Sequence, residues 1–431
     1  MSFYICSNCG YGSASWIGKC PDCGQWNSLK QQQGFDKKTN QPTQDFELTP
    51  LSRIKSSTEK KLATGVYEFD RVIGGGFFPS SVTLLTGEPG IGKSTLLLQI
   101  LKNFKTLYVS GEEGAEQIKQ RLNRLKIKDD NLDFSNTQQI ESIIKGISKN
   151  HKHYQIVVID SIQTIYSNKI EGTAGSISQL RETTSQLITF AKNTNTPVIL
   201  IGHVTKEGEI AGPKTLEHMV DIVLSFEGEK VSHFRILRTP KNRFGSTDEI
   251  GIFEMTSLGL SQVKNPLAFI DDEKSSAPGM SIVGVTEGKR PIFFEIQTLL
   301  SPTILAIPRR VAKGIDYNKI LLLLAVLRKY YGFPLDKYDI YINVVGGVSI
   351  KSTAAELGIV ASLISSFKNK SVKNNTVFIG EIGLLGETRK VVFEEKIISE
   401  ARRLGFKNIY SSKNIKNIKE LKNVFSSWSS V

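Results

Sequence analysis

The chain has 431 residues, 39% of them hydrophobic, and a formal net charge of +13. This length exceeds what a single hydrophobic core usually serves, so we expect two or three domains. No apolar run reaches the ~18 to 20 residues that span a bilayer, and the N-terminus lacks a signal segment, so we expect a cytoplasmic protein without a membrane partner. The charge favours nucleic acid as a partner, although a bias toward Lys, Asn and Ile raises the pI without any ligand.

The N-terminal segment carries two C-x-x-C pairs, formed by Cys6, Cys9, Cys20 and Cys23. Gly10 and Gly24 follow the pairs, as a tight turn that aims amide hydrogens at thiolate sulfur requires. Four thiolates predict a closed, structural Zn²⁺ site in residues 1–30, with Trp16 and Trp26 covering the small module. Two disulfides are the alternative, which a cytosolic chain disfavours. The polar residues 31–49 then predict a linker.

Residues 81–100, "SVTLLTGEPGIGKSTLLLQI", run from a β-rich stretch through a glycine-rich loop into a helical pattern of leucines. This order is the context that a P-loop requires. Its glycines let backbone N–H groups approach phosphates, Lys93 reaches the β- and γ-phosphates, and the Ser94 hydroxyl binds Mg²⁺. The sequence therefore predicts a nucleotide site made of Gly87, Glu88, Pro89, Gly90, Ile91, Gly92, Lys93 and Ser94.

Residues 154–163, "YQIVVIDSIQ", predict a strand buried on both faces that ends in Asp160. After a P-loop, such an aspartate is placed to hold Mg²⁺ through water, with Ser161 beside it. The alternative is that Asp160 only caps the helix that follows.

Two more predicted strands end near polar residues. "TLYVS" at 106–110 leads to Glu112 and Glu113, one of which polarises the attacking water unless both only stabilise the next helix. "TPVILIGHV" at 196–204 carries His203. Strands that alternate with helices and end in polar residues predict an α/β fold with a mostly parallel sheet and a site along one edge.

The order of these motifs resembles the bacterial RadA (Sms) family of DNA repair proteins over essentially the whole chain. The segments that carry the resemblance are the two cysteine pairs, "TGVYEFDRVIGGGF", "GEPGIGKST", "VVIDSIQ", "GHVTKEGEIAGPKTLEHMVD" and "KNRFG". The resemblance implies a RecA-like ATPase core, a hexameric ring like that of DnaB-type helicases, and ATP-driven branch migration on single-stranded and branched DNA. It also implies the recombinase RecA as a partner. Ser80 departs from the family, which usually has glycine there.

The resemblance also assigns roles to individual residues. It adds Thr95 to the ATP site, makes Asp160 the Mg²⁺-side carboxylate, gives Glu112 the place of the catalytic glutamate, and gives His203 that of a γ-phosphate sensor. It places segment 206–221 at the central channel, where Lys206 and Lys214 would touch DNA. An ordinary solvated loop is the alternative for that segment.

The C-terminal part resembles the proteolytic domain of Lon, which uses a serine and lysine pair. Ala354 stands where the serine belongs and Glu395 where the lysine belongs, so both halves of the pair are missing. We expect an ATPase domain at 50–270 and an inactive Lon-like domain at 271–431. By the resemblance, this domain would offer basic surface to duplex DNA through Arg309, Arg310, Lys313 and Lys351.

The stretch "PKNRFGS" places Lys241 and Arg243 one residue apart, and two cations so close need an anion. The γ-phosphate of ATP on a neighbouring subunit is the anion we predict, since phosphoryl-transfer enzymes commonly complete this face with a donated cation. DNA phosphates are the alternative. Phe244 would fix the turn by packing, and Gly245 by a positive φ.

The predicted function is thus a DNA-dependent ATPase of recombination and repair that acts as a translocase. Two other classes compete with it. A non-motor DNA-binding scaffold would use ATP only as an assembly switch, and a Lon-type protease would need the nucleophile that this sequence lacks.

Overall fold

The computed structural model of the chain describes residues 3–7, 10–32, 50, 60–150, 154–203, 212–228, 233–263, 267, 270 and 277–426. Within these ranges, no helix has the length and apolar character to cross a membrane. The predicted linker at 31–49 lies outside them, apart from residues 31 and 32 at the end of a strand. The domain limits given above stay predictions.

The described chain forms two compact units. The P-loop unit comprises the residues up to Phe226 together with Arg238–Ser246 and Ser257–Leu260, and the C-terminal unit comprises Glu227–Leu237, Thr247–Thr256 and the residues from Ser261 onward. A small antiparallel sheet at the N-terminus has the order β2-β1-β3 and consists of β1 (Phe3–Cys6), β2 (Gly12–Ser13) and β3 (Leu29–Gln32).

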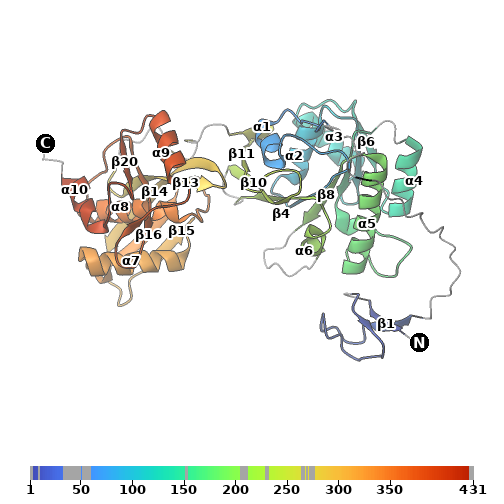
Figure 1. Cartoon of the computed structure of the whole chain (residues 1–431), viewed down its shortest axis with the longest axis horizontal. Coiled ribbons are helices and arrows are strands. Elements are labelled where there is room, and N and C mark those ends of the chain that lie inside the picture. The colour runs from blue at the N-terminus through green and yellow to red at the C-terminus, as the bar shows by residue number, and fades with distance from the viewer. Residues whose placement is uncertain are drawn as a thin grey trace. The chain divides into compact units, whose positions relative to one another are not determined.

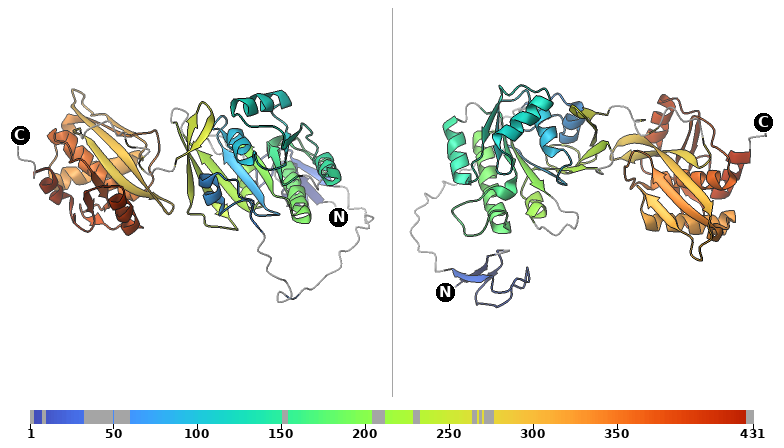
Figure 2. Two further views of the ribbon diagram at one scale, coloured as in Figure 1. Left: turned by 90° about the horizontal axis from the view of Figure 1, so that it is seen from above. Right: turned by 180° about the vertical axis from the view of Figure 1, so that it is seen from behind.

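A nine-stranded sheet of order β12-β11-β10-β9-β4-β8-β7-β5-β6 holds the P-loop (Figure 1). Its strands are β4 (Val82–Gly87), β5 (Thr106–Ser110), β6 (Leu132–Ser135), β7 (Ile156–Asp160), β8 (Val198–His203), β9 (Ile222–Glu227), β10 (Phe234–Asn242), β11 (Ile250–Thr256) and β12 (Gly259–Gln262). The helices are α1 (Tyr67–Ile73), α2 (Lys93–Leu101), α3 (Ala115–Arg124), α4 (Ile140–Asn150), the short η3 (Ile162–Thr164), α5 (Ile177–Thr194) and α6 (Gly212–Glu217). Helices lie on both faces of the sheet (Figure 2).

The central strands of this sheet are parallel and buried on both faces. Every residue of β4 and of β7 is buried, because helices cover both sides. The pairs β4 with β8, β4 with β9, β7 with β8, β5 with β7 and β5 with β6 are all parallel. This confirms the predicted α/β fold and brings the carboxyl ends of the strands to one edge.

The C-terminal unit is built on a mixed six-stranded sheet of order β15-β16-β14-β13-β17-β20. Its strands are β13 (Met280–Glu287), β14 (Arg290–Pro302), β15 (Arg310–Lys313), β16 (Tyr338–Val344), β17 (Thr376–Ile379) and β20 (Asn408–Ser411), with a separate pair of β18 (Glu381–Ile382) and β19 (Thr388–Arg389). The helices are α7 (Tyr317–Tyr331), η4 (Leu335–Lys337), η5 (Thr353–Ala355), α8 (Glu356–Lys368), α9 (Glu394–Arg403), η6 (Ile418–Glu420) and α10 (Leu421–Ser426).

Helix α8 is the centre of the C-terminal core. Its first ten residues are buried, and it approaches β13 so closely that a Cβ on Gly358 would lie 2.2 Å from a methyl carbon of Val283. Such a contact is possible only for glycine, so the sequence of α8 fixes its distance from the sheet.

Candidate functional site

The P-loop lies between β4 and α2, as the sequence predicts. Gly92 caps α2 with a φ of 113°, a value that favours glycine. A Cβ on Gly87 would lie 2.5 Å from the carbonyl oxygen of Phe226, so this position also excludes a side chain. Ser80, where the family usually has glycine, has a φ of 61°. It therefore adopts the left-handed backbone that glycine supplies without cost.

Lys93 is buried, with 4% of its surface exposed. Its ammonium donates to the carbonyl oxygens of Gly87 at 2.8 Å and Glu88 at 3.1 Å, and to Nδ1 of His203 at 3.1 Å. Burial lowers the pKa of Lys93 to about 8, although the charges of Asp160 and Glu112 oppose this change. The ammonium therefore lacks a strong anionic partner of its own, which is the condition that a phosphate would relieve.

Asp160 accepts hydrogen bonds on Oδ2 from the hydroxyls of Ser94 at 3.1 Å and Tyr108 at 2.5 Å. Burial raises the pKa of Asp160, and so do the nearby carboxylates of Glu112 and Glu113, while the two hydroxyls lower it. The Ser94 hydroxyl and the Asp160 carboxylate are hard oxygen ligands at hydrogen-bonding distance from each other, so these residues fit Mg²⁺. Tyr108, fully buried in β5, is a residue that the sequence analysis missed.

The two adjacent glutamates have different partners. Glu113 forms a forked ion pair with Arg121 of α3, at 2.6 and 2.8 Å. Glu112 instead accepts from the Ser161 hydroxyl at 2.5 Å and lies 3.2 Å from Nε2 of His203. The geometry therefore commits Glu113 to α3 and leaves Glu112 facing Lys93 and Asp160.

His203 connects Lys93 to Glu112. Because the Lys93 ammonium only donates, Nδ1 of His203 accepts, and Nε2–H then donates to Glu112. The backbone carbonyl of His203 also accepts from the side-chain amide of Gln163 at 3.3 Å. Ligand atoms of Glu112, Asp160 and His203 all lie within 4.8 Å of one another. Gln163, on η3, is a second residue that the sequence analysis did not single out.

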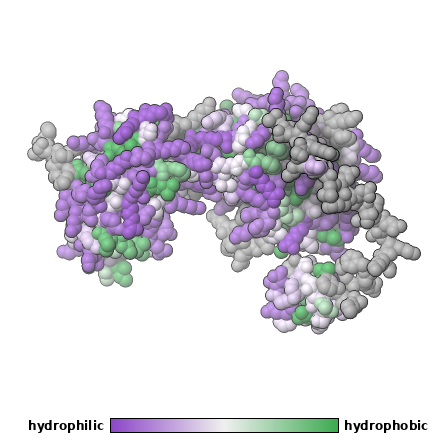
Figure 3. Space-filling view, viewed as in Figure 1, coloured by the Kyte–Doolittle hydropathy of each residue, from purple (hydrophilic) through white to green (hydrophobic). Residues whose placement is uncertain are grey.

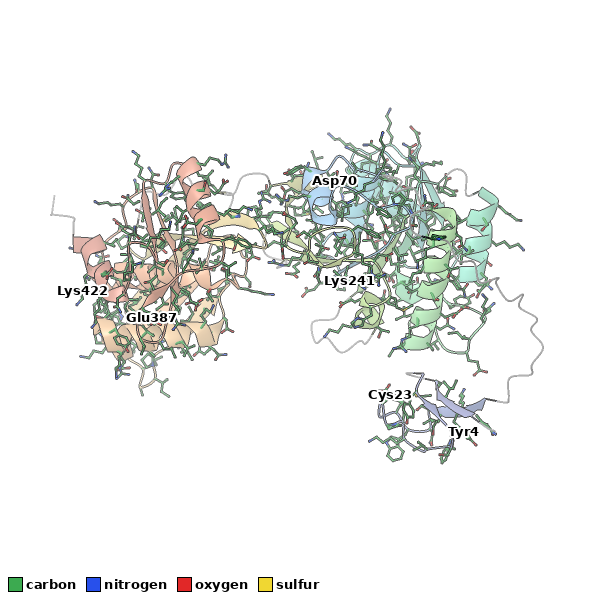
Figure 4. All side chains as sticks on the ribbon, viewed as in Figure 1. Tyr4, Cys23, Asp70, Lys241, Glu387 and Lys422 are labelled. Atoms are coloured by element: carbon green, nitrogen blue, oxygen red, sulfur yellow. The ribbon has the colours of Figure 1, made fainter. Side chains whose placement is uncertain are left out.

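Lys241 and Arg243 lie near the amino-terminal ends of the parallel strands, opposite the carboxyl ends that hold the P-loop. We refer to these two ends of the strands as the two edges of the sheet. Lys241, labelled in Figure 4, donates to the carbonyl oxygens of Glu217 at 2.8 Å and His218 at 3.1 Å. Burial lowers the pKa of Lys241, and the charge of Arg243 lowers it further. Arg243 donates to Asp221 at 3.1 Å, and Asp221 also accepts from the backbone N–H of Val82.

The length of β4 gives the distance between the two edges. Val82 begins β4 and Gly87 ends it, so five residue steps of roughly 3.3 Å separate these edges by about 16 Å. The two cations therefore lie far from the P-loop of their own subunit.

Packing of Phe244 holds the turn at 241–245, as the sequence predicts. Phe244 stacks on Phe78 with ring centroids 4.3 Å apart and planes 7° apart. The prediction of a positive φ at Gly245 is wrong. Close approach favours glycine there instead, because a Cβ would lie 2.9 Å from the side-chain nitrogen of Asn242 and 3.3 Å from Cα of Gly74.

The N-terminal module gathers its described cysteines. The Sγ atoms of Cys6, Cys20 and Cys23 lie within 4.8 Å of one another, and Cys9 falls outside the described residues. Gly10 and Gly24 donate their N–H groups to the carbonyls of the first cysteines of each pair, both at 2.9 Å, so the two turns repeat one geometry. Three converging thiols and the matching turns fit zinc.

The prediction that tryptophans cover this module is wrong. Trp16 is 56% exposed and Trp26 68% exposed, and only Lys19 lies over the Trp26 ring, at 5.5 Å, in the described part of the module. The metal ligands themselves therefore take the place of a hydrophobic core.

The remaining predicted residues are scattered. Lys214 is exposed on α6, and Lys206 lies outside the described residues. Arg309 is exposed, whereas the guanidinium of Arg310 is bound to the carbonyl oxygens of Leu335 and Tyr338. The structure thus separates two neighbouring arginines that the sequence grouped together.

The residues that stand where the resemblance to Lon places the catalytic serine and lysine make no catalytic contact. Ala354 is 1% exposed, and Glu395 is an exposed residue whose carboxylate pairs with Lys413 at 2.5 Å. An alanine methyl and an ion-paired carboxylate cannot replace a hydroxyl nucleophile and a neutral amine.

Comparison with known proteins places these features in a wider context. The ATPase family model described as KaiC matches residues 62–263, and the model described as the rubredoxin metal binding domain matches residues 4–31. DNA repair protein RadA of Listeria monocytogenes is 46% identical over 421 residues, which cover 95% of this chain and 92% of the relative. DNA repair protein RadA of Aquifex aeolicus is 42% identical over 419 residues, which cover 96% and 93%.

Among solved structures, the RadB recombinase is 25% identical, with a TM-score of 0.39, and the match covers 47% of this chain and 100% of that one. A KaiC-like protein of the hyperthermophilic archaeon Pyrococcus horikoshii is 21% identical, with a TM-score of 0.40, and the match covers 47% and 99%.

The thiol cluster predicts one zinc ion per chain. Elemental analysis of the purified protein should find close to one equivalent, and Cys20→Ser should lose it, because three ligands hold Zn²⁺ far more weakly than four. The P-loop unit should still bind nucleotide in this variant. A wild-type protein with almost no zinc would contradict the assignment.

The lowered pKa of Lys93 predicts that ATP binding takes up protons. With a pKa of about 8, Lys93 is about half neutral at pH 8, and the negative triphosphate stabilises its ammonium form. We expect uptake of roughly a tenth of a proton per site at pH 7, half at pH 8 and nearly one at pH 9. Titration calorimetry in buffers of different ionisation enthalpy measures this quantity. An uptake that does not rise with pH would contradict the assignment.

Proposed function

The chain belongs to the DNA repair protein RadA family, and from this premise we propose that it is a DNA-dependent ATPase that works as a hexameric ring and drives branch migration of recombination intermediates. The observation that carries the proposal is the division of charged groups between two edges of one sheet. One edge holds the P-loop with Lys93, Asp160 and Glu112, and the other holds Lys241 and Arg243. Single-stranded and branched DNA are the proposed substrates, and a RecA-type recombinase is the proposed partner.

The residues of the P-loop edge divide the work of phosphoryl transfer. Backbone N–H groups of Gly90–Thr95 and the Lys93 ammonium bind and orient the phosphates. Ser94 and Asp160 would hold Mg²⁺, which neutralises charge that develops on the phosphate oxygens. Lys93 must turn from the carbonyls of the loop toward the phosphates, and this movement releases Nδ1 of His203.

Glu112 is the group that we propose orients the attacking water. It is 40% exposed, so water reaches it, and Ser161 fixes one of its oxygens. His203 lies against the other oxygen and would respond to the γ-phosphate through Lys93. Glu113 is unsuited to this role, because both of its oxygens already accept from Arg121.

Replacing the two glutamates separately tests this assignment. Glu112→Gln should keep ATP affinity within a few-fold and lower kcat by about 10²- to 10⁴-fold, the usual contribution of a positioned general base. Glu113→Gln should retain most of its kcat and lower the unfolding midpoint, because it breaks the forked pair with Arg121. Single-turnover hydrolysis and thermal unfolding measure the two effects. Equal kcat losses in both variants would contradict the division of roles.

The cations of the far edge are the basis for proposing a shared site. About 16 Å of β4 separates its P-loop end from Val82, beside which Asp221 holds Arg243, so these cations lie too far away to reach phosphates in their own P-loop. In a ring, the ATP of one subunit would meet Lys241 and Arg243 of the next, which complete the γ-phosphate face. Both cations must then leave their present partners, the carbonyls of Glu217 and His218 and the carboxylate of Asp221.

Mixed assemblies test the shared site. Subunits with Arg243→Ala should bind ATP normally and yet depress the activity of wild-type subunits in the same ring, because each removes a cation from a neighbour's site. Lys93→Ala subunits, by contrast, should lose nucleotide at their own site. The measurement is ATP hydrolysis against the mixing ratio. If activity follows the wild-type fraction linearly, and Arg243→Ala loses DNA affinity with hydrolysis intact, the cations contact DNA instead.

Strand displacement distinguishes a motor from an ATP-switched scaffold. A translocase should separate or migrate a labelled branched DNA only while it hydrolyses ATP, and Glu112→Gln should abolish this activity while retaining DNA binding. A scaffold should bind and release DNA with a non-hydrolysable analogue as well as with ATP. The replacement of the protease pair by Ala354 and Glu395 supports a binding or assembly role for the C-terminal unit.

A further inference from the structure

The loop between β14 and β15, residues 303–309, exposes large apolar side chains at its tip. Ile304 is 102% exposed, Ile307 84% and Leu305 43%. Isolated exposed hydrophobic residues are ordinary, but several on one projecting loop mark an interaction surface. Figure 3 shows hydrophobic residues on the surface of the C-terminal unit, to which this loop belongs.

The base of this loop is firmly anchored. Backbone N–H groups of Thr303 and Arg309 donate to the carbonyl oxygen of Lys337 at 3.0 Å and to the carboxylate of Asp339 at 2.7 Å. The guanidinium of Arg310 binds the carbonyl oxygens of Leu335 and Tyr338, as described above. Both ends of the tip are therefore held, and its apolar side chains project without the entropy cost of ordering a free loop.

Exposed cationic side chains surround the base of the tip. Residues 301–313 contain three cations and no acid. Arg310 is used internally, but Arg309, Lys313 and nearby Lys337 are exposed, and their side chains have no ion-pair partner among the described residues. An apolar tip ringed by unpaired cations is complementary to a polyanion that also offers an apolar interior.

We propose that this tip is a wedge for duplex DNA: Ile304 and Ile307 enter an opened base step at a branch point while Arg309 and Lys313 contact the flanking phosphates. The proposal rests on the proposed function, which makes branched DNA the substrate. Proteins that insert Ile, Leu or Pro between base steps unstack them and bend the duplex, and a branch point already lacks part of that stacking. The wedge would therefore favour junctions over continuous duplex.

A second copy of the chain is the competing occupant. A cavity of about 640 Å³ lies beside the loop, and its lining includes Leu299, Val311, Tyr341 and Met280. A tip of one copy seated there would bury the same isoleucines. The cations near the tip favour DNA, because Glu295, the one acid that lines the cavity, is buried and already accepts a hydrogen bond from Gln297, while Lys313 itself lies in the cavity wall.

The test uses the full chain and a forked DNA with 2-aminopurine at the branch point. Wild-type protein should raise the 2-aminopurine fluorescence, since the fluorophore brightens when unstacked. Ile304→Ser with Ile307→Ser should reduce this rise at least threefold and leave the salt dependence of binding unchanged. Arg309→Ala with Lys313→Ala should lower the slope of log affinity against log salt by about two. Val392→Ser, at a site 74% exposed in the same unit, is the matched control and should match wild type.

Three results would overturn the wedge. Serine variants with a wild-type fluorescence rise would show that the tip does not enter the base step. A loss of molar mass by light scattering in those variants, with fluorescence per bound protein unchanged, would assign the tip to a contact between copies. If no DNA stimulates ATP hydrolysis by the wild type, the proposed function fails and the wedge with it, whereas normal stimulation with unaffected serine variants rejects the wedge alone.

Discussion

Parallel strands end at a common edge of their sheet, and the register of those strands decides which ends meet. Here Gly87 of β4 pairs with His203 of β8, and Ser110 of β5 pairs with Asp160 of β7. The loops that leave these ends carry Lys93 and Glu112 into the same small volume. A slip of one residue in either pair would turn these side chains to the opposite face and separate them. The candidate site thus depends on the pairing of these strand ends.

Burial destabilises the charged form of Lys93 at this edge. The Lys93 ammonium is almost completely buried among carbonyls and an imidazole, with carboxylates near but not in direct contact, so its charged form is unfavourable and its pKa falls. Binding a polyphosphate supplies the missing charge. At the far edge, Lys241 is held by carbonyls and Arg243 by Asp221, contacts that are weaker than a pair with a phosphate. In the proposed ring, each edge would be completed by the other edge of a neighbouring copy.

The C-terminal unit combines a rigid core with an unusual surface. Helix α8 is locked onto the sheet at Gly358, and Ala354, which stands where the resemblance to Lon places a serine, is packed into that core. Its exposed apolar residues include Ile304 and Ile307 on the loop after β14, and Leu321 and Leu322 on α7. The buried helix α8 and these exposed side chains thus belong to different segments of the unit.

The sequence alone was sufficient for the α/β fold, the P-loop and the zinc module, because each is encoded by residues close together in the chain. Tertiary structure decided what depends on distant partners. The two adjacent glutamates look equivalent in the sequence, and the forked ion pair with Arg121 is what distinguishes Glu113 from Glu112. The register of the sheet places the Tyr108 hydroxyl against Asp160. Local rules failed at Gly245, where a close approach by Gly74, 171 positions away in the numbering, favours glycine without a positive φ. A sequence pattern records which residue is present, but the contact that constrains it exists only after the chain has folded.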